Sequence, residues 1–92
     1  MDLHALLERV NSKETFLEFV AALRDDWEAE RTEEQIKPSS PYGPGARGWE
    51  NGSIGAFLDA MHAWTEDSGE RVASTPDWRT FAHILYAGKF YE

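Results

Sequence analysis

Apolar side chains recur at helical spacing in four stretches of the chain, and the first two lie in its N-terminal third. One comprises Leu3, Leu6, Leu7 and Val10, and the next comprises Phe16, Phe19, Val20, Leu23 and Trp27. The first pattern predicts a short helix over about residues 3–10, capped by Asp2. The second predicts a longer helix that ends near Arg31. At its start, Asn11 followed by Glu14 has the spacing of a capping box.

The other two stretches lie in the C-terminal half. One comprises Ile54, Phe57, Leu58, Met61 and Trp64, and the other comprises Trp78, Phe81, Ala82 and Leu85. Ser53 is a suitable N-cap for the third helix, and Gly69 is its expected C′ residue. Thr75 and Pro76 have the identities of a cap and a first helical residue for the fourth helix, which we expect Gly88 to end.

No stretch alternates apolar and polar residues as a half-buried strand would, and no internal repeat is present. The sequence therefore predicts an all-α fold, a small single-domain bundle of about four amphipathic helices around a tryptophan-rich centre. One long irregular segment, about residues 35–53, holds three of the four prolines and four of the seven glycines. We read it as a connection within one domain over residues 1–92. A loop of this length is usually functional or mobile.

The amino-acid composition excludes several classes of function. The 92 residues include no cysteine, which removes disulfides, thiolate metal sites and a cysteine nucleophile. A net charge of −8 disfavours nucleic acids and anionic membranes as partners. No apolar run approaches the ~20 residues that span a bilayer, and the first ten residues lack the basic character of a signal peptide. We expect a soluble, cytoplasmic protein.

The negative charge is concentrated in the N-terminal third. Residues 1–35 hold ten acidic and four basic side chains, whereas residues 36–92 hold seven and five. Six acids lie within residues 25–34, and such a surface either speeds encounter with a basic partner or serves solubility alone. Tyr42 and Trp49 are each either an exposed partner contact or an anchor for the loop, and the position of Trp49 beside a helix favours the anchor. The candidate partner-binding residues are Asp25, Asp26, Glu28, Glu30, Glu33, Glu34, Tyr42 and Trp49.

The sequence contains few motifs that are typical of catalysis or cofactor binding. Residues 43–48 match G-x-G-x-x-G, but no strand is predicted before them and no helix directly after them, so we interpret them as a turn. No nucleophile elbow, P-loop or metalloprotease helix occurs. Asp59, His62 and Glu66 fall at i, i+3 and i+7, where a metal or an acid–base site could be built, or where a solvated helix face would carry local ion pairs. We predict no cofactor, no metal and no catalysis, with these three residues as the alternative.

The order of residues in the C-terminal half resembles a family of small bacterial proteins classed as a domain of unknown function. The family motif W-E-N is present at Trp49, F-L-x-A-x-x-x-W runs from Phe57 to Trp64, and P-x-W-x-x-F-A-x-I-L-x-A-x-K-x-Y-E runs from Pro76 to Glu92. With the upstream helix, the match covers about two thirds of the chain. The segment Pro38–Gly48 and the short connection after Trp64 depart from the family pattern.

The resemblance implies an all-helical cytoplasmic domain and carries over no catalytic residue. The net charge, the small size and the lack of a reaction-bearing constellation favour an acidic protein-interaction or regulatory module, including an immunity-type role against a toxin. The alternative is a metal- or small-ligand-binding protein or enzyme that uses Asp59, His62 and Glu66. A homodimer formed through exposed aromatic residues stays open beside a monomer.

Overall fold

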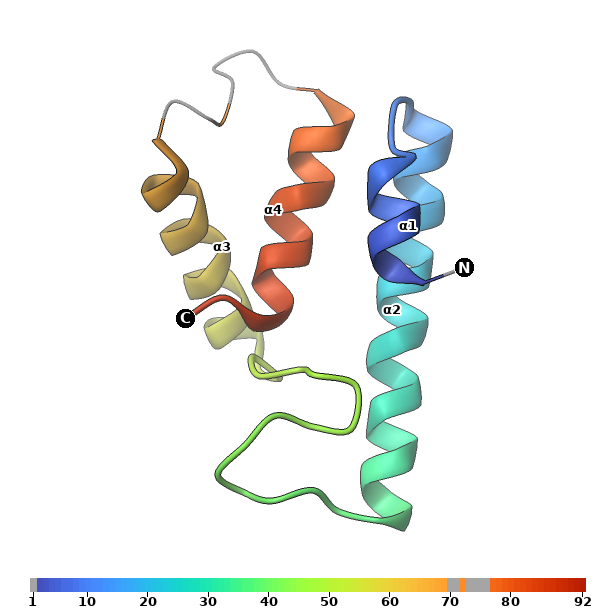
Figure 1. Cartoon of the computed structure of the whole chain (residues 1–92), viewed down its shortest axis with the longest axis vertical. Coiled ribbons are helices and arrows are strands. Elements are labelled where there is room, and N and C mark those ends of the chain that lie inside the picture. The colour runs from blue at the N-terminus through green and yellow to red at the C-terminus, as the bar shows by residue number, and fades with distance from the viewer. Residues whose placement is uncertain (1, 70–71, 73–76) are drawn as a thin grey trace.

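The computed structural model describes residues 2–69, 72 and 77–92, and within these residues it shows four helices and no strand. They are α1 (Leu3–Glu8), α2 (Lys13–Ile36), α3 (Ile54–Ser68) and α4 (Trp78–Phe90). The helix α4 lies between α3 and the α1–α2 pair, and the segment that joins α2 to α3 loops beside the far half of α2 (Figure 1). The all-α fold class is therefore confirmed. None of the described helices combines the length and apolarity needed to cross a membrane.

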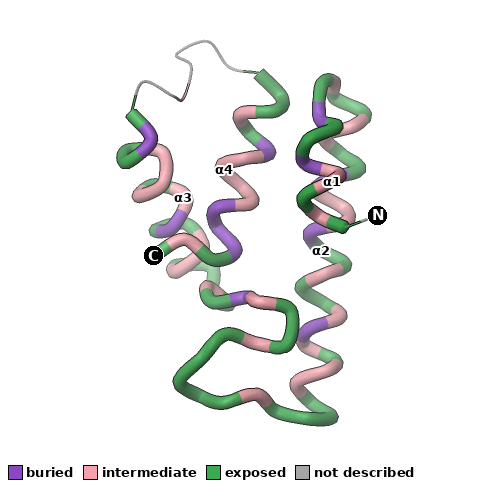
Figure 2. Tube along the Cα trace, viewed as in Figure 1, coloured by how far each residue is buried: buried purple, intermediate pink, exposed green. Residues whose placement is uncertain are grey.

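The core lies where α1, α2 and α4 meet, and the segment before α3 completes it. Its buried members are Leu7, Val10, Phe19, Leu23, Trp49 and Ala82. The predicted tryptophan-rich centre is wrong, because Trp49 is the one buried tryptophan, while Trp27 and Trp78 are exposed and Trp64 is half-buried. Small residues of α4, such as Ala82, let the helices approach closely, and the large rings buried in this core are those of Phe19 and Trp49. Figure 2 shows buried stretches on α1, α2 and α4.

The first two helices differ from the prediction at their ends. The helix α1 is capped by Asp2 as predicted, but it ends at Glu8 instead of residue 10. The cap of α2 is Ser12, one residue later than predicted, because the Thr15 hydroxyl accepts from the Ser12 amide at 3.0 Å and the Ser12 hydroxyl accepts from the Thr15 amide at 3.2 Å. The side chain of Asn11 accepts a bond from the same threonine hydroxyl. The capping box therefore exists, with threonine in place of Glu14.

The second helix continues to Ile36, five residues beyond the predicted end at Arg31. Apolar periodicity gives no sign of this last turn, which is rich in Glu and Gln. The turn nevertheless has an inward face, formed by carboxylates that accept hydrogen bonds from the neighbouring segment. Polar contacts thus extend the helix where an apolar face would normally be required.

The third helix agrees with the prediction, with Ser53 as its N-cap and Gly69 directly after its last residue. The predicted cap Thr75 and first residue Pro76 of the fourth helix lie outside the described residues, and the cap of α4 is Asp77, which accepts from the Thr80 amide at 2.8 Å. Gly88 was expected to end α4 and instead lies buried inside it.

Gly88 lies inside α4 because α3 approaches α4 closely at this position. A Cβ atom at Gly88 would stand 2.7 Å from the ring of Phe57, which is closer than real side chains pack. Glycine is therefore needed inside α4 at this position, despite its poor helix propensity.

Two glycine substitutions test this contact. We expect Gly88→Ala to lower the free energy of unfolding by about 1–2 kcal/mol, because the added methyl group displaces the Phe57 ring. Gly55→Ala, on α3 where a Cβ meets nothing within 4 Å, should raise it by up to about 1 kcal/mol through helix propensity. Urea unfolding followed by circular dichroism measures both. A stabilised Gly88→Ala protein would show that the two helices can separate freely.

Candidate functional site

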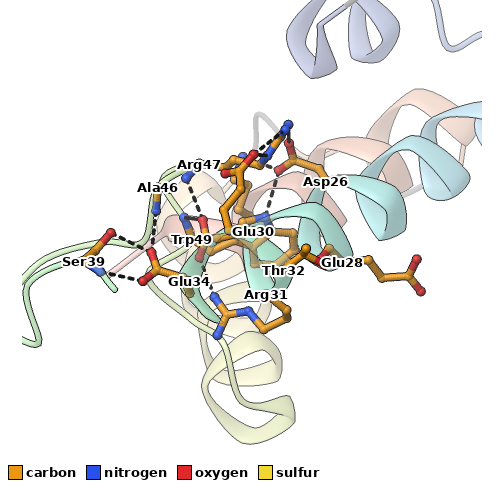
Figure 3. A network of polar contacts seen from close by, with 12 residues as sticks. Asp26, Glu28, Glu30, Arg31, Thr32, Glu34, Ser39, Ala46, Arg47 and Trp49 are labelled. Atoms are coloured by element: carbon orange, nitrogen blue, oxygen red, sulfur yellow. Dashed lines mark hydrogen bonds and ion pairs between the residues drawn. The ribbon is translucent and has the colours of Figure 1, made fainter. Parts of the chain in front are cut away.

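Four carboxylates on one face of α2 hold the segment that joins α2 to α3. These inner carboxylates are Asp26, Glu30, Glu33 and Glu34, at positions i, i+4, i+7 and i+8. They continue the helix face that begins with the buried residues Phe19 and Leu23. Asp26 also contacts α4, and beyond it this face meets the irregular segment (Figure 3).

Glu30 is the most buried polar residue, with no exposed surface. Its Oε2 atom accepts hydrogen bonds from the backbone amides of Arg47, at 2.8 Å, and Trp49, at 3.2 Å. Its Oε1 atom accepts from the guanidinium of Arg31 at 2.5 Å. A Cβ at Gly45 would collide with this carboxylate, so glycine lets the backbone pass beside it. The charge is thus buried with both oxygens bonded.

Glu34 holds the two ends of the loop tip together. One oxygen accepts from the Ser39 amide at 2.6 Å, and the other accepts from the Ser39 hydroxyl at 2.6 Å and from the Ala46 amide at 2.8 Å. The hydrogen bonds from Ser39, followed by that from Ala46, lower the pKa of the Glu34 carboxyl below its usual value. Residues 39 and 46 are therefore fixed to the same helix turn.

Asp26 of α2 bonds both to the irregular segment and to α4. It accepts from the indole N–H of Trp49 at 2.8 Å and from the Lys89 ammonium at 2.9 Å. Burial by itself raises the pKa of Asp26, but the hydrogen bonds from Lys89 and Trp49 and the lysine charge outweigh it, so the pKa lies below its usual value. The buried Lys89 also lies 5.5 Å from the centre of the Trp49 ring.

Arg47 completes the network from the loop side. Its guanidinium donates to Glu33 at 3.1 and 2.8 Å, and these bonds and the charge of Glu33 raise the pKa of Arg47. Beside it, a cleft of about 710 Å³ with mixed polar and apolar walls opens against the start of α1, α2 and the end of α4, with Asp26 and Lys89 among its lining residues. Because the charges of these groups are paired with each other, the network acts as a structural connection.

The eight partner-binding candidates therefore occupy three environments. Glu30 and Trp49 are buried, and the hydrogen bonds of Trp49 to Glu30 and Asp26 agree with its interpretation as a loop anchor. Asp26, Glu33 and Glu34 are bonded within the chain. Asp25, Glu28 and Tyr42 are exposed, and their role in binding stays a prediction. Figure 3 shows Glu28 pointing away from the network.

The other candidate motifs have local explanations. His62 pairs with Glu66 at 3.4 Å on an exposed helix face. Asp59 does not complete a metal cluster with them, and across residues 2–69, 72 and 77–92 no three acidic or histidine side chains are placed to hold a metal ion. The glycine-rich residues 43–48 form a turn, in which the amide of Gly48, with φ of +84°, donates to the Gly45 carbonyl at 3.0 Å.

The sequence did not predict which basic side chains and backbone amides bond to the inner carboxylates. Lys89 and Arg47 stand far from α2 in the chain, and no spacing rule links them to it. The backbone amides of residues 46, 47 and 49 leave no trace in residue type. The one available signal was indirect, because the six acids and one base of residues 25–34 need positive charge or hydrogen-bond donors from elsewhere in the chain.

The described residues thus form a small all-α protein in which one helix holds a long irregular segment through carboxylates. Residues 12–92 match the model of a family of unknown function (DUF7660), and the chain belongs to this family. The predicted resemblance to a family without assigned chemistry is therefore confirmed. No curated protein and no solved structure matches the chain.

Replacing Glu30 with glutamine tests the buried carboxylate. Glutamine keeps the size but loses the charge, and its NH2 group faces either the Arg31 guanidinium or the two loop amides, so one of these donors loses its acceptor. We expect Glu30→Gln to lower the free energy of unfolding by about 2–4 kcal/mol. The matched control is Glu28→Gln, an exposed residue on the same helix, which should change it by less than about 0.5 kcal/mol. Equal effects of the two variants in urea unfolding would contradict the assignment.

The network also predicts how stability depends on pH. Because the pKa of Asp26 is lowered in the folded protein, its contribution is complete above the unfolded pKa of about 4 and is lost as the pH falls through the folded value. Asp26→Asn should therefore be less stable than the wild type by about 2–4 kcal/mol at neutral pH. This difference should shrink below about pH 4.

The control for this measurement is Glu50→Gln. Burial, then repulsion by Glu92, raises the pKa of Glu50, so removing its charge should stabilise the protein at neutral pH and have no effect in acid. Urea unfolding at a series of pH values compares the two variants. A destabilisation by Asp26→Asn that stays constant down to pH 3 would mean that the carboxylate charge is not what holds Lys89 and Trp49.

Proposed function

We propose that the protein is an interaction or regulatory module that binds a basic partner protein through the outward face of α2, without catalysis. The observation that carries the proposal is the outer carboxylate row, four exposed acids on the side of α2 opposite the network. It consists of Glu14, Glu18, Asp25 and Glu28. The row spans about 21 Å of helix.

The outer carboxylate row is not neutralised within the described part of the chain. Asp25 contacts Arg24 at 3.0 Å, and no basic side chain contacts the other three. The inner carboxylates differ, because each of them accepts bonds from the loop or from a basic residue. The negative field of α2 is therefore directed outward, where it speeds encounter with positive surfaces and selects among partners. Neutralising or regulating a basic protein, such as a toxin, is a role that this surface would serve.

The test is capture of a partner from the native host at low and high salt. We expect the tagged protein to retain a basic protein at low salt and to release it at high salt, because exposed charges are screened. The triple variant Glu14→Gln/Glu18→Gln/Glu28→Gln should retain several-fold less, since each exposed ion pair contributes about 0.2–1 kcal/mol.

The matched control, Glu8→Gln/Glu50→Gln/Glu92→Gln, changes the net charge by the same amount at exposed positions elsewhere. It should retain the partner as the wild type does. An equal loss of retained partner in both triple variants would show that binding depends on net charge alone and not on the outer carboxylate row. Absence of any retained protein at low salt would remove the basis of the proposal.

A further inference from the structure

A cleft with mostly apolar walls lies at the end of the molecule where α2 ends and the irregular segment begins (Figure 1). It measures about 470 Å³, a volume that can enclose a small organic group. Ile36, in its wall, is 81% exposed to water. We call this hollow the Ile36 cleft, and it is lined by Glu33, Ile36, Lys37, Pro38, Ser39 and Ala46.

Tyr42 lies on the loop tip between two residues that line the Ile36 cleft, and its side chain is 97% exposed. The loop tip holds the ring out in water. The Gly43 amide donates to the Ser40 carbonyl at 3.3 Å, and the Tyr42 amide donates to the Ser40 hydroxyl at 3.2 Å. Glu34 fixes both ends of the tip to α2. The ring is thus already held in place before any contact, which lowers the entropy cost of burying it in a partner.

The charge at this end of the molecule differs from that of the chain as a whole. The net charge is −8, yet residues 35–49 contain Lys37 and Arg47 and no acidic residue. Glu33, in the cleft wall, is paired with Arg47 at 2.8 Å. Two negative copies can therefore meet at this end without bringing their outer carboxylate rows together, and the repulsion between them is smaller here.

We infer that two copies of the protein associate through this end, with the Tyr42 ring of each copy in the Ile36 cleft of the other. The exposed ring and the apolar cleft belong to the same end of the chain. A two-fold axis between the copies therefore fills both clefts at once, as in other isologous dimers. Tyrosine suits such a contact, because it buries a large rigid ring and keeps a polar hydroxyl at its tip.

Sedimentation equilibrium over a series of protein concentrations measures the association. The two rings bury about 150–250 Å² each, so the contact is smaller than the ~1,200 Å² of an ordinary stable interface. We therefore expect a weak dimer, with a dissociation constant of about 10 μM to 1 mM. A protein that remains a monomer at the upper end of this range would overturn the inference.

Substitutions of exposed residues locate the contact without disturbing the fold. Tyr42→Ser and Ile36→Ser should each weaken the dimer at least about tenfold, because both apolar contacts of the two-fold pair are lost together. Tyr42→Phe keeps the ring and should associate nearly as the wild type does. The matched control is Ile54→Ser, since Ile54 is also 81% exposed but begins α3. Equal losses in Ile36→Ser and Ile54→Ser, or a dimer that Tyr42→Ser leaves intact, would place the contact elsewhere and overturn the inference.

Salt separates this self-association from the capture of a basic partner. Raising the salt concentration should strengthen the dimer, because it screens the repulsion between two negative chains, whereas it should release the basic partner. The variant Glu14→Gln/Glu18→Gln/Glu28→Gln should not weaken the dimer, because the outer carboxylate row takes no part in it. A dimer that dissociates in high salt, or through this triple variant, would rest on charge and would contradict the apolar contact.

Discussion

The burial of the Glu30 carboxylate fixes the part of the structure that lies beyond the helical core. Removing a carboxylate from water costs several kcal/mol, and only a full set of donors offsets it. Here the donors are the Arg31 guanidinium and two backbone amides of the loop. Because those amides belong to residues 47 and 49, the charge determines where the chain returns to α2 before it enters α3.

The position of Trp49 follows from this return. Its backbone bonds to Glu30, its indole N–H bonds to Asp26, and its ring lies 6.3 Å from that of Phe57. The same Asp26 binds Lys89 of α4. One residue of an irregular segment thus connects α2, α3 and α4, and it substitutes for direct packing between α2 and α3. A chain of this length has few apolar residues for a second packed interface, so polar contacts hold α2 and α3 in place instead.

Helical periodicity was sufficient to predict the fold class, the start of α1 and both ends of α3, because an apolar stripe is a local property of the sequence. It failed where the burial partner is not apolar. The last turn of α2 has no stripe, since Glu30 and Glu34 face backbone amides that no residue type reveals. It failed again at Gly88, because glycine commonly follows the end of a helix, whereas this glycine lies inside α4 and leaves space for the Phe57 ring of α3. Ile54 belongs to the apolar stripe of α3 and yet is exposed, because a stripe does not say whether another helix covers it.

The two sets of carboxylates on α2 explain how one helix can be structural and remain strongly charged. A net charge of −8 on a small chain opposes compaction through self-repulsion. The inner carboxylates reduce this repulsion by their contacts with Arg47 and Lys89, which come from the loop and from α4. In the outer carboxylate row only Asp25 is paired with a basic side chain within the described residues, so most of its mutual repulsion remains in the folded chain. The positively charged partner proposed above would lower this repulsion, and the same helix can therefore hold the loop on one face and carry unpaired charge on the other.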